Sequence, residues 1–102
     1  MRILALDLGP SWRGGQVQTY LVARALAGRG HDVTVGAREE SPLARRAAEA
    51  GLGVLPLPGG GEASPRVLLR LARGARAFRP DVVWAGDAKA HGAAAWSRVS
   101  RR

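Results

Sequence analysis

Residues 26–37 read LAGRGHDVTVGA, and this stretch decides the fold, because a helix end, a glycine stop and a strand follow one another directly. Gly30 is predicted to take the left-handed conformation with which many helices end. The short apolar run over residues 32–37 is then a strand candidate. The stretch predicts a helix-to-strand connection, and the same connection recurs along the chain.

Four short apolar runs are strand candidates, at residues 3–8, 32–37, 53–57 and 81–85. Helical patterns lie between them, over residues 15–29, from Ser41-Pro42 to Gly51 and from Ser64-Pro65 to Pro80, and a further helix is expected after Asp87. Strands that alternate with helices predict a parallel sheet with right-handed crossovers. We therefore expect an α/β, Rossmann-like open sheet of four βα units over residues 1–102, in strand order 3-2-1-4. The prolines of the third run predict an edge strand.

The first helix is predicted to turn an apolar band toward the sheet. Helical spacing puts Val17, Leu21, Val22, Ala25 and Leu26 in this band.

Composition excludes several classes of site and limits the partners. The chain has no cysteine, and His31 and His91 are too few and too distant to predict zinc, so no metal is expected. No stretch reaches the roughly 18 consecutive apolar residues of a membrane span. The net charge of +8 comes from arginines that are scattered through the helices and not interleaved with aromatic residues, so we expect no nucleic-acid partner. A cytoplasmic protein is expected, with at most peripheral contact to the cytoplasmic face of a membrane.

Two loops are predicted at the ligand edge of the sheet. In open α/β sheets, ligands bind outside the carboxyl ends of the strands, here between the first and the fourth. Residues 9–16 and 85–91 follow these strands. Gly14 and Gly15 open a helix, where free N–H groups and the helix dipole favour an anion. The spacing is neither G-x-G-x-x-G nor a P-loop, and a turn that needs glycine is an alternative explanation.

Three segments resemble one known family. Residues 12–18 read WRGGQVQ, residues 26–34 read LAGRGHDVT, and residues 79–91 read RPDVVWAGDAKAH. They resemble the N-terminal domain of family 4, GT-B-fold glycosyltransferases, which show a glycine pair at the first helix, an ARGHxVT run and an RPDVVHAHDSHAH region. The resemblance spans essentially the whole chain. Trp84 and Gly86 depart from it where histidines are common, as does Gln18 where an acidic residue is frequent.

The resemblance implies metal-independent transfer of a sugar from a nucleotide-sugar donor to a hydroxyl of an acceptor glycan or lipid, without a cofactor. It implies substrate contacts at Gly14, Gly15, Gln16, Asp87 and His91, and no catalytic residue within this chain. For His91, a hydrogen bond to nearby backbone at a helix start is the alternative. It further implies that the chain is an incomplete half of a GT-B N-terminal domain, on the acceptor side, and inactive by itself.

Two other functions compete with this interpretation. One is a stand-alone Rossmann-like nucleotide-binding module, which the absent G-x-G-x-x-G and the absent acidic residue at the end of the second strand disfavour. The other is a basic adaptor for nucleic acid, which requires the arginines to converge in space.

Overall fold

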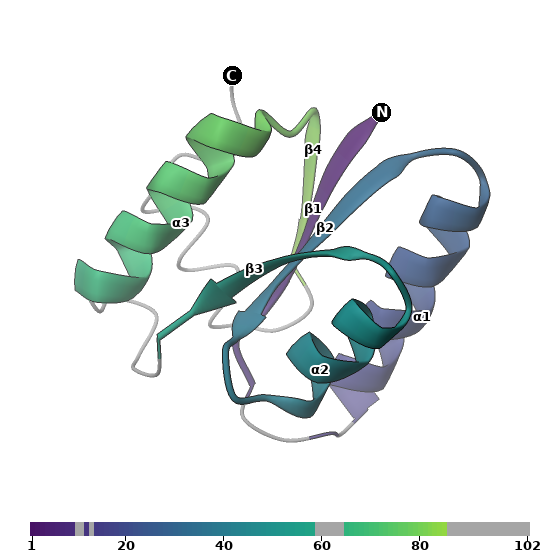
Figure 1. The fold of residues 1–102 in the computed structure, drawn as a ribbon, viewed down its shortest axis with the longest axis horizontal. Coiled ribbons are helices and arrows are strands. Elements are labelled where there is room, and N and C mark those ends of the chain that lie inside the picture. The colour runs from purple at the N-terminus through teal and green to yellow at the C-terminus, as the bar shows by residue number, and fades with distance from the viewer. Residues whose placement is uncertain (10–11, 13, 59–64, 86–102) are drawn as a thin grey trace.

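The computed structural model describes residues 1–9, 12, 14–58 and 65–85, which form an alternating series of strands and helices (Figure 1). The elements are β1 (Arg2–Asp7), α1 (Gly14–Gly28), β2 (Asp32–Arg38), α2 (Pro42–Glu49), β3 (Gly53–Leu57), α3 (Pro65–Phe78) and β4 (Val82–Ala85). The helix predicted after Asp87 lies outside the described residues.

The strands form one four-stranded sheet in the order β3-β2-β1-β4. All three pairings are parallel; Ala5 of β1, for example, lies opposite Val35 of β2 and Trp84 of β4. The predicted α/β class and strand order are confirmed. Pro56 lies in the edge strand β3, where its missing N–H removes no hydrogen bond from a central strand.

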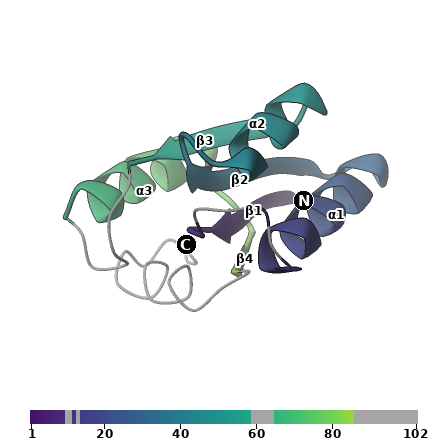
Figure 2. The same cartoon turned by 90° about the horizontal axis from the view of Figure 1, so that it is seen from below.

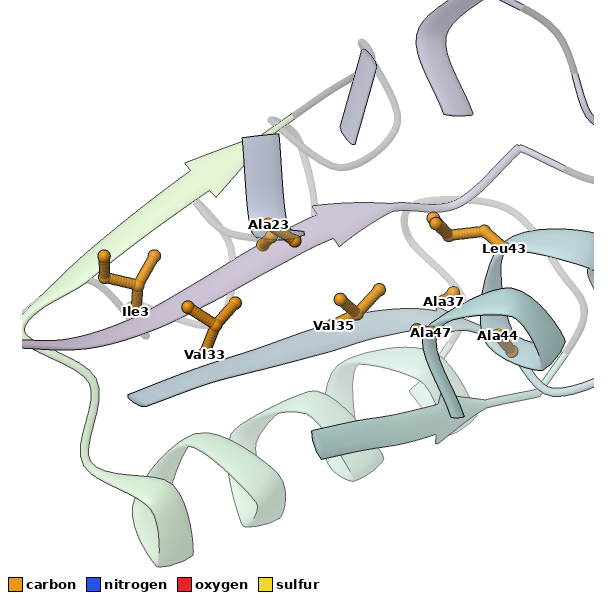
Figure 3. Close-up of a cluster of buried hydrophobic side chains, with 9 residues drawn as sticks. Ile3, Ala23, Val33, Val35, Ala37, Leu43, Ala44 and Ala47 are labelled. Atoms are coloured by element: carbon orange, nitrogen blue, oxygen red, sulfur yellow. The ribbon is translucent and has the colours of Figure 1, made fainter. Parts of the chain in front are cut away.

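Helices cover both faces of the sheet. One face packs against α1 and α2 through the cluster Ile3, Ala5, Ala23, Val33, Val35, Ala37, Leu43, Ala44 and Ala47 (Figure 3). The other face packs against α3 through Leu4, Leu6, Leu8, Leu57, Val67, Leu71 and Ala75. In Figure 2, α3 lies at the left of the picture and α1 at the right, with the strands between them. Burial on both faces explains why β1 is almost continuously apolar.

The helix boundaries follow from local chemistry. Ser41 accepts a hydrogen bond from the Ala44 N–H at 3.2 Å and caps α2. Gly30 has φ +93° and Gly51 has φ +81°, as predicted for residues that end helices. The Leu52 N–H then donates to the Ala47 carbonyl at 3.0 Å, which completes the stop of α2.

The predicted inward face of α1 is wrong in part. The buried residues of α1 are Gln16, Thr19 and Ala23, whereas Leu21 is 55% exposed and Ala25 is exposed as well. The polar side chains of Gln16 and Thr19 face inward because Gln16 forms a hydrogen bond with Gly9 in the first loop and Thr19 with Asp7 at the end of β1. The apolar periodicity contains no sign of these bonds.

Gly36 is a test of the close packing between β2 and β1. A Cβ at this position would lie 2.6 Å from Cδ2 of Leu6, which is completely buried and has little room to move. We expect Gly36→Ala to lower the free energy of unfolding by about 1–3 kcal/mol, as overpacked cores do. Urea unfolding measures the loss. The control is Gly28→Ala, where a Cβ meets nothing within 4 Å and no loss is expected; equal effects of the two substitutions would contradict the packing.

Candidate functional site

The topology places a switch point at the carboxyl ends of β1 and β4. β1 lies between β2 and β4, and the chain leaves β1 toward α1 and β2, whereas β4 lies on the opposite side of β1. Ligands of open parallel sheets bind at such a switch point. Here Gly9 follows β1 and Gly14 begins α1.

Gly14 and Gly15 begin α1 at this edge, as predicted, and both are exposed. The first N–H groups of a helix have no partner within the helix and carry the positive end of its dipole. No acidic residue lies in the first turn. A Cβ on Gly14 would meet nothing within 4 Å, and Gly14 is not among the glycines with positive φ. Neither packing nor backbone conformation within the described residues explains this glycine, and none of those residues lies within 4 Å of its Cβ position.

The buried carboxylate of Asp7 binds the start of the loop at Gly9. Asp7 ends β1, is 2% exposed, and accepts a hydrogen bond from the Gly9 N–H at 2.9 Å. The hydroxyl of Thr19, completely buried in α1, lies 3.2 Å from the other carboxylate oxygen and 2.9 Å from the Gly15 carbonyl. A hydroxyl has one proton and donates to one of these acceptors at a time. The carboxylate thus links β1, the loop and the first turns of α1.

Gln16 also binds the start of the loop at Gly9. Its side chain is 2% exposed and its Nε2 donates to the Gly9 carbonyl. Its Oε1 is buried without a hydrogen-bond partner, and such an atom costs roughly 1–3 kcal/mol if nothing supplies a donor. The structure therefore buries Gln16 against Gly9 and leaves Gly14 and Gly15, at the start of α1, exposed.

Trp12, a residue of the first loop, packs against side chains of α1 and α2. Its ring makes an edge-to-face contact with Tyr20 of α1, at 5.6 Å between centroids and an interplanar angle of 68°. The guanidinium of Arg46 in α2 lies 4.4 Å from the centroid of the Trp12 ring. Aromatic and cation–π contacts of this kind contribute about 0.5–1.5 kcal/mol each. The loop is therefore tied to both α1 and α2.

Sequence reasoning missed the supporting residues of the site. The sequence predicts no supporting role for Asp7 or Thr19. A signal was present, since a carboxylate at the end of an apolar strand has to find donors when it is buried. Asp87 and His91, the other predicted site residues, lie outside the described residues.

The part of the chain that the structure describes contains no group of three or more histidine, cysteine, aspartate or glutamate residues able to hold a metal ion. It also contains no helix long and apolar enough to cross a membrane.

These features define a class: a Rossmann-like α/β domain whose first loop presents a glycine-rich helix start at the switch point of the sheet. The model of Glycosyltransferase Family 4 matches residues 12–102, and the chain belongs to this family. No curated protein sequence is similar enough to count as a match.

Solved GT-B glycosyltransferases share the fold. MurG of Acinetobacter baumannii superposes with a TM-score of 0.74 at 14% identity, covering 96% of this chain and 32% of that protein. HepE of Anabaena, solved in complex with UDP-glucose, gives 0.73 at 19% identity, covering 100% and 27%. The glycosyltransferase VinC, solved in complex with dTDP, gives 0.67 at 18% identity, covering 96% and 33%. The chain thus spans about a third of the length of these proteins.

The carboxylate of Asp7 provides the test of the loop support. Asp7→Ala removes the acceptor of the partly buried Gly9 N–H, whereas the Thr19 hydroxyl keeps the Gly15 carbonyl as an acceptor, and we expect the substitution to lower the free energy of unfolding by about 1–3 kcal/mol. Hydrogen exchange at the Gly9 amide should accelerate at the same time. The matched control is Asp81→Ala, because Asp81 is exposed and accepts a backbone N–H, that of Arg2, at 2.8 Å. A loss no larger than that of the control would contradict a supporting role for Asp7.

Proposed function

We propose that this chain forms part of a glycosyltransferase that moves a sugar from a nucleotide-sugar donor to the hydroxyl of an acceptor. Family membership supports glycosyl transfer in general. The observation that carries the finer proposal is the exposed Gly14–Gly15 start of α1, with open space over Gly14 and buried support beneath it.

The donor would meet the site through its phosphate groups. Unpaired N–H groups at a helix start bind phosphate oxygens, and the helix dipole adds about 0.3–1 kcal/mol for each negative charge at an exposed site. HepE and VinC were solved with UDP-glucose and dTDP, which fits a donor of this chemical class. We assign Gly14 and Gly15 to donor contact, with Gln16 positioning their loop.

The rest of the substrate site is proposed from the family resemblance. Asp87 and His91 follow β4, whose carboxyl end lies at the same edge of the sheet as that of β1, and we propose that they contact substrate there. The acceptor, a glycan or a lipid, would lie on this domain. We propose that the reaction uses neither a metal nor a cofactor, as the family resemblance implies. A cytoplasmic location with at most peripheral membrane contact belongs to the same proposal.

A stand-alone dinucleotide-binding module is the alternative. Such modules end the second strand with an acidic residue that binds the ribose hydroxyls. Here β2 ends in Arg38, whose guanidinium lies 3.4 Å from the carboxylate of Glu40. The absence of an acidic side chain at the end of β2 disfavours a module of the NAD-binding type.

Gly14→Ala separates ligand contact from folding. Because a Cβ at Gly14 meets no atom of the described residues within 4 Å, we expect the substitution to leave the free energy of unfolding unchanged within about 1 kcal/mol. The same methyl group would occupy the space of the donor phosphates. In the complete enzyme, the Michaelis constant for the nucleotide-sugar should rise by roughly tenfold, on the scale of one lost phosphate contact.

Gly28→Ala is the control, since this glycine ends the same helix at the opposite edge and also has no neighbour within 4 Å. Kinetics with a panel of nucleotide-sugars and their matched acceptors would show the difference. If the two variants have equal constants for the donor, the glycine loop is not a donor site.

Residues 1–102 by themselves are expected to be inactive. They span about a third of the solved glycosyltransferases, and a GT-B cleft closes between two domains. Correct positioning of two reactants lowers the activation barrier by on the order of 7–11 kcal/mol, and part of one domain does not provide that positioning. Calorimetry should detect no donor binding below about millimolar concentration, where a binding free energy is near 4 kcal/mol. Micromolar affinity of this chain alone would overturn the expectation.

A further inference from the structure

A pocket lined by arginines lies between the carboxyl end of β3 and helix α3. It is a surface pocket of about 180 Å³, lined by Pro58, Arg66, Leu69, Arg70 and Arg73. Figure 1 shows α3 beside the end of β3, and the core contacts place α3 on the face of the sheet opposite to α1.

Helical spacing gathers three arginines at this pocket. Val67, Leu71 and Ala75 of α3 are buried against the sheet. Arg66, Arg70 and Arg73 follow one another at intervals of four and three residues, which places them on one stripe of the helix. All three are exposed. One N–H group of Arg70 donates to the Pro56 carbonyl at 3.0 Å, so the guanidinium is oriented by the end of β3.

The positive charge of the pocket is not neutralised by the described part of the chain. The helix sequence PRVLLRLARGARAF contains four arginines and no acidic residue. Among the described residues, the one salt bridge joins Arg38 to Glu40, and neither Arg66 nor Arg73 forms an ion pair. Like charges at these spacings destabilise a helix. An anion bound between the arginines would remove that repulsion.

We propose that this pocket binds a phosphate group. Guanidinium groups donate paired N–H groups, which match phosphate oxygens bidentately, and a tetrahedral phosphate can accept from several arginines at once. Leu69, 54% exposed, adds an apolar side to the pocket. The proposed site is separate from the glycine loop, because its residues come from α3 and the end of β3.

Nucleic acid is a poorer match for this pocket. Proteins that bind single strands place aromatic side chains beside their basic residues for stacking with bases. The residues that line the pocket include no aromatic side chain. The chemistry present recognises the phosphate group and offers nothing for the bases.

The first experiment titrates the intact protein with inorganic phosphate and follows the arginine side-chain N–H signals by NMR. We expect saturable shifts at Arg66, Arg70 and Arg73. The double variant Arg66→Gln/Arg73→Gln should weaken binding by about tenfold, as expected when two exposed ion pairs are lost.

The matched control is Arg45→Gln/Arg76→Gln, which removes the same charge from exposed positions that do not line the pocket. We expect less than about a twofold effect from it. Equal weakening by the two double variants, or shifts that never saturate, would overturn the proposal, because binding would then depend on net charge alone.

A second experiment distinguishes a free phosphate compound from a lipid headgroup. The protein is sedimented with vesicles of phosphatidylglycerol and, separately, of phosphatidylcholine. For a headgroup, Leu69→Gln should reduce sedimentation with the anionic vesicles and leave the inorganic phosphate titration unchanged. For a free phosphate compound, the anionic vesicles should sediment no more protein than the neutral ones. An oligonucleotide that binds more tightly than either probe, and whose binding the Arg66→Gln/Arg73→Gln variant abolishes, would replace the phosphate assignment with nucleic acid.

The same variants keep this proposal distinct from the donor site. Arg66→Gln/Arg73→Gln should leave the Michaelis constant for the nucleotide-sugar unchanged, whereas Gly14→Ala should raise it and leave the α3 phosphate shifts intact. Either proposal can therefore fail without the other.

Discussion

The buried carboxylate of Asp7 is the interaction on which the candidate site depends. It lies at the end of the central strand β1, binds the Gly9 N–H and lies against the Thr19 hydroxyl of α1. A buried carboxylate is costly unless its oxygens receive hydrogen bonds, so the loop and the helix are held where they can supply them. Through this constraint, the sheet determines where the glycine start of α1 is presented.

The buried residues around this loop differ from the exposed ones in chemical type. The side chains of Asp7, Gln16 and Thr19 are buried, and Trp12 is held at the side by Tyr20 and Arg46. Gly14 and Gly15 remain at the surface. A loop that is fixed from below can present its backbone N–H groups without reorganisation when a ligand binds, and preorganisation of this kind reduces the entropic cost of binding.

Charge is distributed unevenly between the two faces of the sheet. On one face, α2 carries Glu49 beside its arginines, and Arg46 stacks on Trp12. On the other face, α3 carries four arginines without an acidic residue. The linear sequence shows arginines scattered through the chain, but folding brings three of them to one pocket. The net charge does not reveal this convergence. Convergence depends on which arginines share one stripe of a helix and on which part of the sheet that stripe faces.

The sequence by itself determined the order and the approximate bounds of the strands and helices, because both depend on local signals. Apolar runs, Ser41 before Pro42, and Gly30 and Gly51 act over a few residues, and the strands and helices follow them within one or two positions. The parallel sheet and its strand order then follow from the alternation of strands and helices. Only the tertiary structure decided which face of α1 is buried, that Gln16 lies beneath the loop and that Asp7 meets Thr19. These facts depend on hydrogen bonds between residues distant in the chain, which periodicity does not encode.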